Sequence, residues 1–141
     1  MSGGVVFKTA VDQYIPRIAI FALPYVFSLP FFAICFVWAA WKMEDRMYRQ
    51  FIIAALFISL TSMLIYIIFP TYVVRPHLTG SGWAVQLESF IYQHDNVYNA
   101  FPSGHVYTTT LVAIFWSRWN SKFSWLFSGI VLLVALSTLF T

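Results

Sequence analysis

The chain has 141 residues, of which 60% are hydrophobic, 21% aromatic and only 9% charged. So few ionic side chains cannot cover the surface of a water-soluble globule, which excludes an ordinary soluble domain and favours an integral membrane protein. The formal net charge of +3 comes from Lys and Arg in polar segments, so it gives no reason to expect a nucleic-acid partner. Cys35 is the only cysteine, which excludes an intrachain disulfide.

Four apolar stretches are candidate membrane spans, because a helix needs about 20 apolar residues to cross the hydrocarbon layer. We expect one all-α membrane domain over residues 1–141, with spans at about 18–41, 51–69, 103–119 and 123–141. The first contains Pro24 and Pro30, which we expect to bend the helix without ending it. The third is short for a complete crossing. We expect the charged segment 42–49 to be the loop between the first two spans.

Residues 71–100 form a long polar and aromatic segment between the second and third spans. Loops of this length in compact proteins usually have a function. Inside it, Trp83, Leu87, Phe90 and Ile91 recur at helical spacing, which predicts a short amphipathic helix lying in the membrane interface. The turn 79–82 would lead into it.

The basic residues predict the orientation of the chain. One side carries Lys42, Arg46, Arg49, Arg118 and Lys122, and the other carries Lys8, Arg17 and Arg75. The positive-inside rule places the first group in the cytoplasm, so we expect a multi-pass protein whose long loop lies on the extracytoplasmic side. The last span ends at Thr141 in apolar sequence, and we therefore expect the chain to be the N-terminal portion of a longer protein.

Two groups of residues with reactive side chains occur at the outer ends of predicted spans. Arg75 follows the second span, and Pro102-Ser103-Gly104-His105 opens the third. Ionisable side chains at membrane depth are costly and tend to mark sites. A guanidinium, a hydroxyl, unobstructed N–H groups at glycine and a helix N-terminus are what a phosphate requires. His105, with an ordinary pKa near 6.5, could give a proton to a departing oxygen.

These residues resemble two motifs of the PAP2 (type 2 phosphatidic acid phosphatase) superfamily. Arg75-Pro76 is similar to the end of its first motif, and Pro102 to His105 matches its second motif in full. The run 98–106 also resembles the branch of inositol phosphorylceramide synthase-like proteins. The resemblance implies that Arg75, Ser103 and the Gly104 N–H hold phosphoryl oxygens, while His105 protonates the leaving group.

The sequence also departs from the family pattern. Ile68 stands where the first motif has a lysine, so one phosphate-binding cation is missing. Ser137 fits the start of the third motif, but Thr138 replaces its arginine. The nucleophilic histidine would be the seventh residue after Ser137, which lies beyond Thr141. We therefore expect the 141 residues alone to be inactive.

Other polar residues of the loop have simpler explanations. Asp95 and Asn99 are possible headgroup contacts, although such residues also cap helices and form turns. His77 and His94 are typical of loop histidines exposed to water. No residues have a spacing typical of metal ligands, and the implied reaction needs no cofactor.

The sequence supports three hypotheses. The first is a PAP2-like lipid phosphatase or phosphotransferase, acting on a lipid phosphate or phosphodiester through a phosphohistidine. The alternative is a non-catalytic membrane protein that binds an anion or lipid headgroup with Arg75 and residues 102–105. The third is a haem or metal site formed by His77, His94 and His105. The membrane lipid is the expected partner, and the sequence does not set the oligomeric state.

Overall fold

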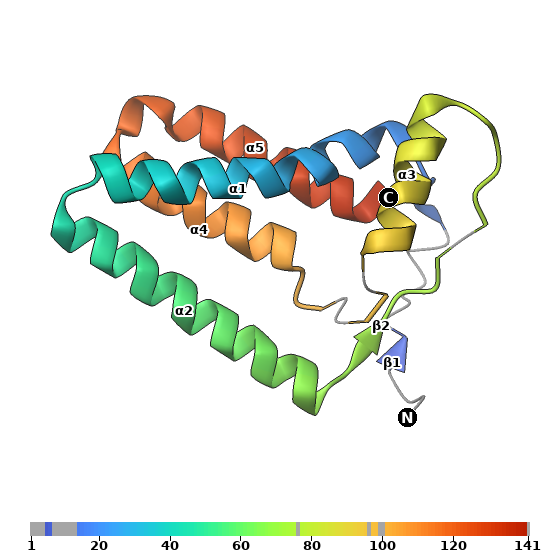
Figure 1. Ribbon diagram of the computed structural model, residues 1–141, viewed down its shortest axis with the longest axis horizontal. Helices are drawn as coiled ribbons and strands as arrows, with labels where there is room; N and C mark the ends of the chain where they lie inside the picture. The colour runs from blue at the N-terminus through green and yellow to red at the C-terminus, as the bar shows by residue number, and fades with distance from the viewer. Residues whose placement is uncertain (1–4, 7–13, 76, 96, 99–100, 141) are drawn as a thin grey trace.

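The computed structural model describes residues 5–6, 14–75, 77–95, 97–98 and 101–140. The long helices are α1 (Ala22–Lys42), α2 (Asp45–Ile68), α4 (Gly104–Trp119) and α5 (Ser124–Phe140). They form an elongated bundle, and the shorter α3 (Trp83–His94) lies across one of its ends (Figure 1). The 3-10 helices η2 (Ala19–Phe21) and η3 (Ser121–Phe123) precede α1 and α5. Apart from the parallel pairing of β1 (Val5–Val6) with β2 (Thr71–Tyr72), the fold is all-α, as predicted.

Three helical stretches in the described part of the chain are long and apolar enough to cross a membrane. They are Ala19–Lys42, Asp45–Ile68 and Ser121–Phe140. The predicted third span corresponds to α4, whose 16 residues extend about 24 Å and fall short of the roughly 30 Å hydrocarbon layer. α4 packs against α1, α2 and α5, so it is the central helix of the bundle.

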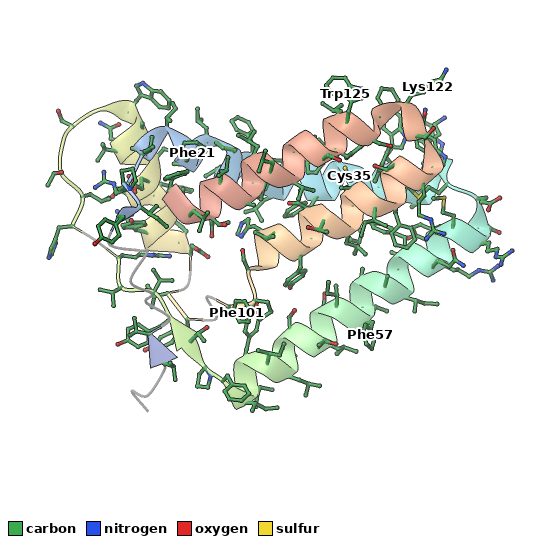
Figure 2. The ribbon with its side chains drawn as sticks, turned by 180° about the vertical axis from the view of Figure 1, so that it is seen from behind. Phe21, Cys35, Phe57, Phe101, Lys122 and Trp125 are labelled. Carbon is green, nitrogen blue, oxygen red and sulfur yellow. The ribbon has the colours of Figure 1, made fainter. Side chains whose placement is uncertain are left out.

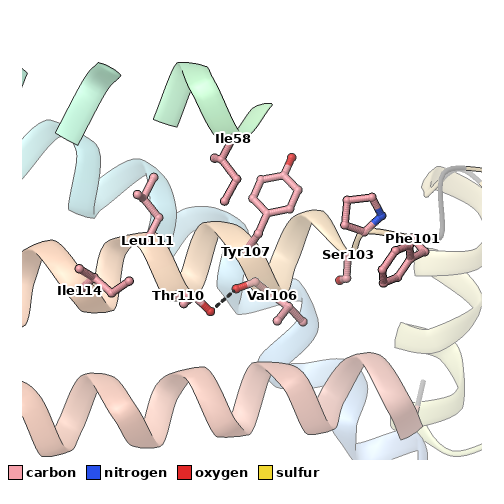
Figure 3. A pocket seen from close by; sticks show the side chains of 9 residues that line it. Ile58, Phe101, Ser103, Val106, Tyr107, Thr110, Leu111 and Ile114 are labelled. Carbon is pink, nitrogen blue, oxygen red and sulfur yellow. Dashed lines mark hydrogen bonds between the residues drawn. The ribbon is translucent and has the colours of Figure 1, made fainter. Parts of the chain in front are cut away.

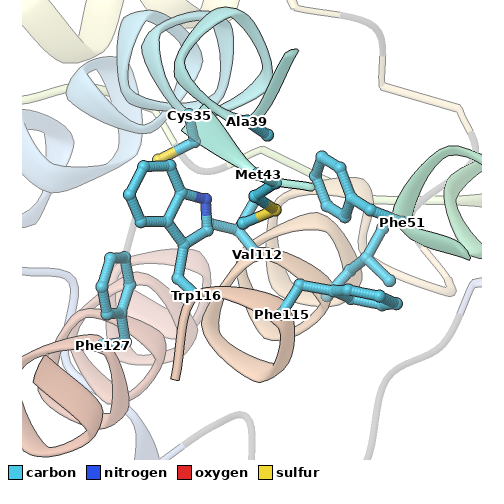
Figure 4. Close-up of a cluster of buried hydrophobic side chains, with 9 residues drawn as sticks. Cys35, Ala39, Met43, Phe51, Val112, Phe115, Trp116 and Phe127 are labelled. Atoms are coloured by element: carbon cyan, nitrogen blue, oxygen red, sulfur yellow. The ribbon is translucent and has the colours of Figure 1, made fainter. Parts of the chain in front are cut away.

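The bundle is held together by an aromatic core near the end that carries the α1–α2 and α4–α5 turns (Figure 4). Phe51 is fully buried, with its ring centroid 5.3 Å from that of Phe115. Trp116 stacks on Phe127 at 5.7 Å. In contrast, Phe57 and Trp125 point outward and are 72% and 76% exposed, as expected of side chains that face lipid (Figure 2).

The first loop is much shorter than predicted. Only Met43 and Glu44 separate α1 from α2, because α2 already begins at Asp45. The prediction of a loop over 42–49 was therefore wrong. A negative side chain in the first turn is favourable beside the positive end of the helix dipole, and Arg has a high helix propensity, so the charged sequence continues the helix.

The predicted helix in the long loop exists, but its buried face differs from the expected one. Ile91 is buried, whereas Trp83 and Phe90 are 60% and 53% exposed. Glu88 is fully buried instead, because its carboxylate pairs with Arg17 at 2.9 Å. The exposed aromatic side chains suit the membrane interface, where Trp is enriched.

Candidate phosphate-binding site

The two ends of the long loop meet at one end of the bundle. The Val73 N–H donates to the Val97 carbonyl at 2.9 Å, and the Phe101 N–H donates to the Thr71 hydroxyl at 3.0 Å. These bonds bring the segment after α2, which carries Arg75, to the segment that enters α4. The end of α2 and the start of α4 therefore lie at the same end of the bundle, and the convergence of Arg75 and residues 103–105 on one ligand stays a prediction.

Arg75 extends from the segment after β2 toward the C-terminal end of α3. Its Nη1 donates to the Tyr92 carbonyl at 2.6 Å, and its Nη2 pairs with Asp95 Oδ2 at 3.2 Å. The guanidinium also lies 4.7 Å above the Tyr92 ring. Two of its five N–H donors are used in these contacts. Arg75 thus pairs with a carboxylate of its own chain in this structure.

Tyr25 of α1 connects Asp95 to His105. Its hydroxyl donates to Asp95 Oδ2 at 2.7 Å, and its ring lies 4.0 Å from the His105 ring, tilted by 30°. Arg75, Asp95, Tyr25 and His105 therefore form a continuous series of contacts, which we call the site network. Sequence analysis missed Tyr25, and its only signal was a phenol within an otherwise apolar span.

His105 has a buried ring nitrogen that lacks a partner in the described structure. Its Nε2 makes no hydrogen bond, and the rings of Tyr25 and Phe32 lie beside it at 4.0 and 6.4 Å. Buried polar atoms are nearly always satisfied, so an unpaired one requires a physical reason. Trp116 Nε1 is the other buried side-chain atom without a partner in the described part of the chain, and it lies in the aromatic core.

Ser103 and Gly104 form the N-terminus of α4. Ser103 is the N-cap residue, yet its hydroxyl makes no capping hydrogen bond. A Cβ at Gly104 would meet no atom closer than the Tyr107 hydroxyl at 3.8 Å, so packing does not require glycine there. What glycine provides is an uncovered backbone at a helix N-terminus, where N–H groups can bind an anion.

The remaining predicted residues have various positions. Ser137 is fully buried in α5, and its hydroxyl donates to the Val134 carbonyl at 2.7 Å. The Pro102 carbonyl accepts from the Tyr66 hydroxyl at 2.5 Å. Asp95 ends α3 and pairs with Arg75. Pro76 and Asn99 lie outside the described residues.

The three histidines do not form a common site. His77 and His94 are exposed, whereas the His105 ring nitrogen is buried. Among the residues that the structure describes, no three His, Cys, Asp or Glu side chains gather closely enough to hold a metal ion. The hypothesis of a metal or haem held by the three histidines is therefore wrong, because the fold separates their side chains.

The fold and the apolar helices define the class: an all-α protein whose long helices suit a membrane. No family model, no curated protein and no solved structure matches the chain. A function is therefore proposed below from the motifs and from the site network.

Proposed function

We propose that the chain forms the phosphate-binding part of a PAP2-like lipid phosphatase or phosphotransferase. The observation that carries this proposal is the site network, in which Arg75 is joined through Asp95 and Tyr25 to His105, whose buried Nε2 has no hydrogen-bond partner among the described residues. The substrate class is a lipid phosphate or phosphodiester, because the surrounding helices are apolar and the site lies at their ends.

Each residue of the site has a role in this reaction. Arg75 would turn from the Asp95 carboxylate to phosphoryl oxygens, which can likewise accept two parallel charge-assisted hydrogen bonds from the guanidinium. The Ser103 hydroxyl and the Gly104 N–H would hold further oxygens. His105 would donate a proton from Nε2 to the leaving oxygen as its bond to phosphorus breaks. By resemblance, a histidine attacks phosphorus, and water or an alcohol then resolves the phosphohistidine.

Binding is tested with a short-chain phosphatidic acid and the purified protein in detergent. Arg75→Gln keeps the size of the side chain but removes the cation, so we expect Kd to rise about tenfold or more. Arg49→Gln is the matched control, because Arg49 is exposed on α2 and bonds only to the Asp45 carbonyl of its own helix in the described contacts. Equal affinity of Arg75→Gln and the unmodified protein would contradict the proposal.

Catalysis is tested with imidazole, added to the 141-residue chain as an external nucleophile. We expect phosphate release from phosphatidic acid only when imidazole is added, through a phosphoimidazole that water hydrolyses. His105→Ala should abolish this release because the leaving oxygen loses its proton donor. His94→Ala, at an exposed position, should leave it unchanged.

A non-catalytic headgroup-binding protein is the alternative, and the presence of Ile68 in place of a phosphate-binding lysine favours it. It predicts no phosphate release with or without imidazole. It also predicts that His105→Ala leaves the affinity for phosphatidic acid nearly unchanged.

A further inference from the structure

An apolar pocket of about 460 Å³ lies between α2 and α4, beside the candidate phosphate site (Figure 3). Ile58 contributes to it from α2, and Phe101, Pro102 and Ser103 line the end where α4 begins. Further lining residues follow one face of α4 from Val106 to Ile114. The pocket therefore extends along the helix away from the residues of the second motif.

The pocket exists because α2 is joined to α4 at two separate places. Near the start of α2, Phe51 packs on Phe115 at 5.3 Å. Near its end, the Tyr66 hydroxyl donates to the Pro102 carbonyl at 2.5 Å. Between these contacts α2 diverges from α4 (Figure 1). The space between them is thus framed by the fold and does not depend on one flexible side chain.

The lining is apolar along its length and polar at one end. Thr110 lies midway, but its hydroxyl already donates to the Val106 carbonyl at 2.8 Å (Figure 3). Ser103, whose hydroxyl makes no capping bond, lies at the end next to Gly104. A ligand that fits this pattern has an apolar chain and one polar head, with the head at the start of α4.

We propose that this pocket binds one acyl chain of the lipid whose phosphate lies at Ser103 and Gly104. The inference rests on the proposed function for the position of the headgroup. The apolar lining along α4 from Val106 to Ile114 ends at Ser103, next to the proposed headgroup position, so one lipid can occupy both places. A single acyl chain is narrow enough to enter it from the surrounding bilayer.

The test is photo-crosslinking in nanodiscs with a phosphatidic acid that carries a diazirine midway along one acyl chain. Mass spectrometry of the labelled peptides locates the chain. We expect labelling to concentrate on the face of α4 from Val106 to Ile114. Filling the pocket from either wall, with Ile114→Trp or Ile58→Trp, should reduce this labelling about fivefold to tenfold.

Leu60→Trp is the matched control, because Leu60 is 60% exposed on α2 and does not line the pocket. Circular dichroism and thermal unfolding check that each variant folds. Because Ile114→Trp and Ile58→Trp fill the pocket from opposite walls, the test still holds if one of them fails to fold. Even labelling of all lipid-facing residues, unchanged in both folded Trp variants, would overturn the inference.

Arg75→Gln separates this inference from the proposed function. If the variant loses pocket labelling while Ile58→Trp also blocks it, both proposals are supported. If Arg75→Gln keeps full labelling and diacylglycerol competes as well as phosphatidic acid, the acyl-chain site is supported and the phosphate site fails. If phosphatidic acid binds in an Arg75-dependent manner without concentrating label in the pocket, the acyl-chain site fails alone.

Discussion

At the scale of single residues, Tyr25 is the side chain that links Asp95 to His105 in the site network. Its hydroxyl fixes Asp95, and its ring covers one face of the His105 imidazole. Asp95 in turn holds the Arg75 guanidinium. Tyr25 thus helps to position the histidine by packing and the arginine through Asp95.

This role predicts different effects for two substitutions of Tyr25. Tyr25→Phe keeps the ring but removes a hydrogen bond to a carboxylate, so we expect a loss of about 1–2 kcal/mol in the free energy of unfolding. Tyr25→Ala also removes the ring beside His105 and should cost more. Unfolding by denaturing detergent measures both. Tyr14→Phe is the control, because Tyr14 is 83% exposed, and should stay within about 0.5 kcal/mol.

At the scale of elements, α3 depends on a buried ion pair for its position. The Glu88 carboxylate is fully buried and accepts from Arg17 Nε at 2.9–3.0 Å and from the Tyr92 hydroxyl at 3.3 Å. Burial and the neighbouring Glu88 carboxylate both raise the pKa of Tyr92. Because Tyr92 and Asp95 are partners of Arg75, this docking of α3 also positions the Arg75 side chain.

Removing one member of this pair should release α3 from the bundle. Glu88→Ala leaves the Arg17 cation partly buried without its partner, and we expect a cost of about 2–4 kcal/mol. Hydrogen exchange measures this release. The exchange rate of the α3 amides should increase, while the rates in the other helices stay unchanged. The double variant with Arg17→Met and Glu88→Leu should recover much of the loss, because it leaves no unpaired charge. Unchanged α3 protection in Glu88→Ala would show that the pair does not hold the helix.

At the scale of the whole molecule, the described basic side chains of the predicted cytoplasmic side gather at one end of the bundle. That end carries the α1–α2 and α4–α5 turns, while α3 and β2, the strand that precedes Arg75, lie at the opposite end (Figure 1). The predicted division of charge between the two sides is therefore present in the fold. The face of the membrane on which each end lies stays a prediction.

Cysteine labelling in intact cells tests this orientation. In a Cys35→Ser background, Ser81→Cys should react with an impermeant maleimide from outside, because Ser81 is exposed just before α3. Ser121→Cys, exposed in the opposite turn, should react only after permeabilisation. The reverse pattern would refute the extracytoplasmic position of the long loop. Equal labelling of both cysteines in intact cells would refute the prediction that the two ends of the bundle lie on opposite sides of the membrane.

The sequence alone determined the helical class, three of the four predicted spans and the presence of a helix in the long loop. These features depend on the local density and spacing of apolar residues, which sequence analysis reads directly. It also indicated that Arg75 and residues 102–105 occur at helix ends on one side, because consecutive spans alternate in direction. The exact start of α2 was missed, because local charge resembles a loop even where it continues a helix.

Only the tertiary structure decided which side chains surround these residues. The contacts of Tyr25 with Asp95 and His105, and of Arg17 with Glu88, join positions that are far apart in the sequence. No local pattern specifies such partners, because they depend on how the helices pack. The buried Glu88 and the pocket between α2 and α4 also depend on helix packing. Glu88 can be buried because Arg17, distant in the sequence, reaches its carboxylate. The pocket forms because α2 and α4 diverge.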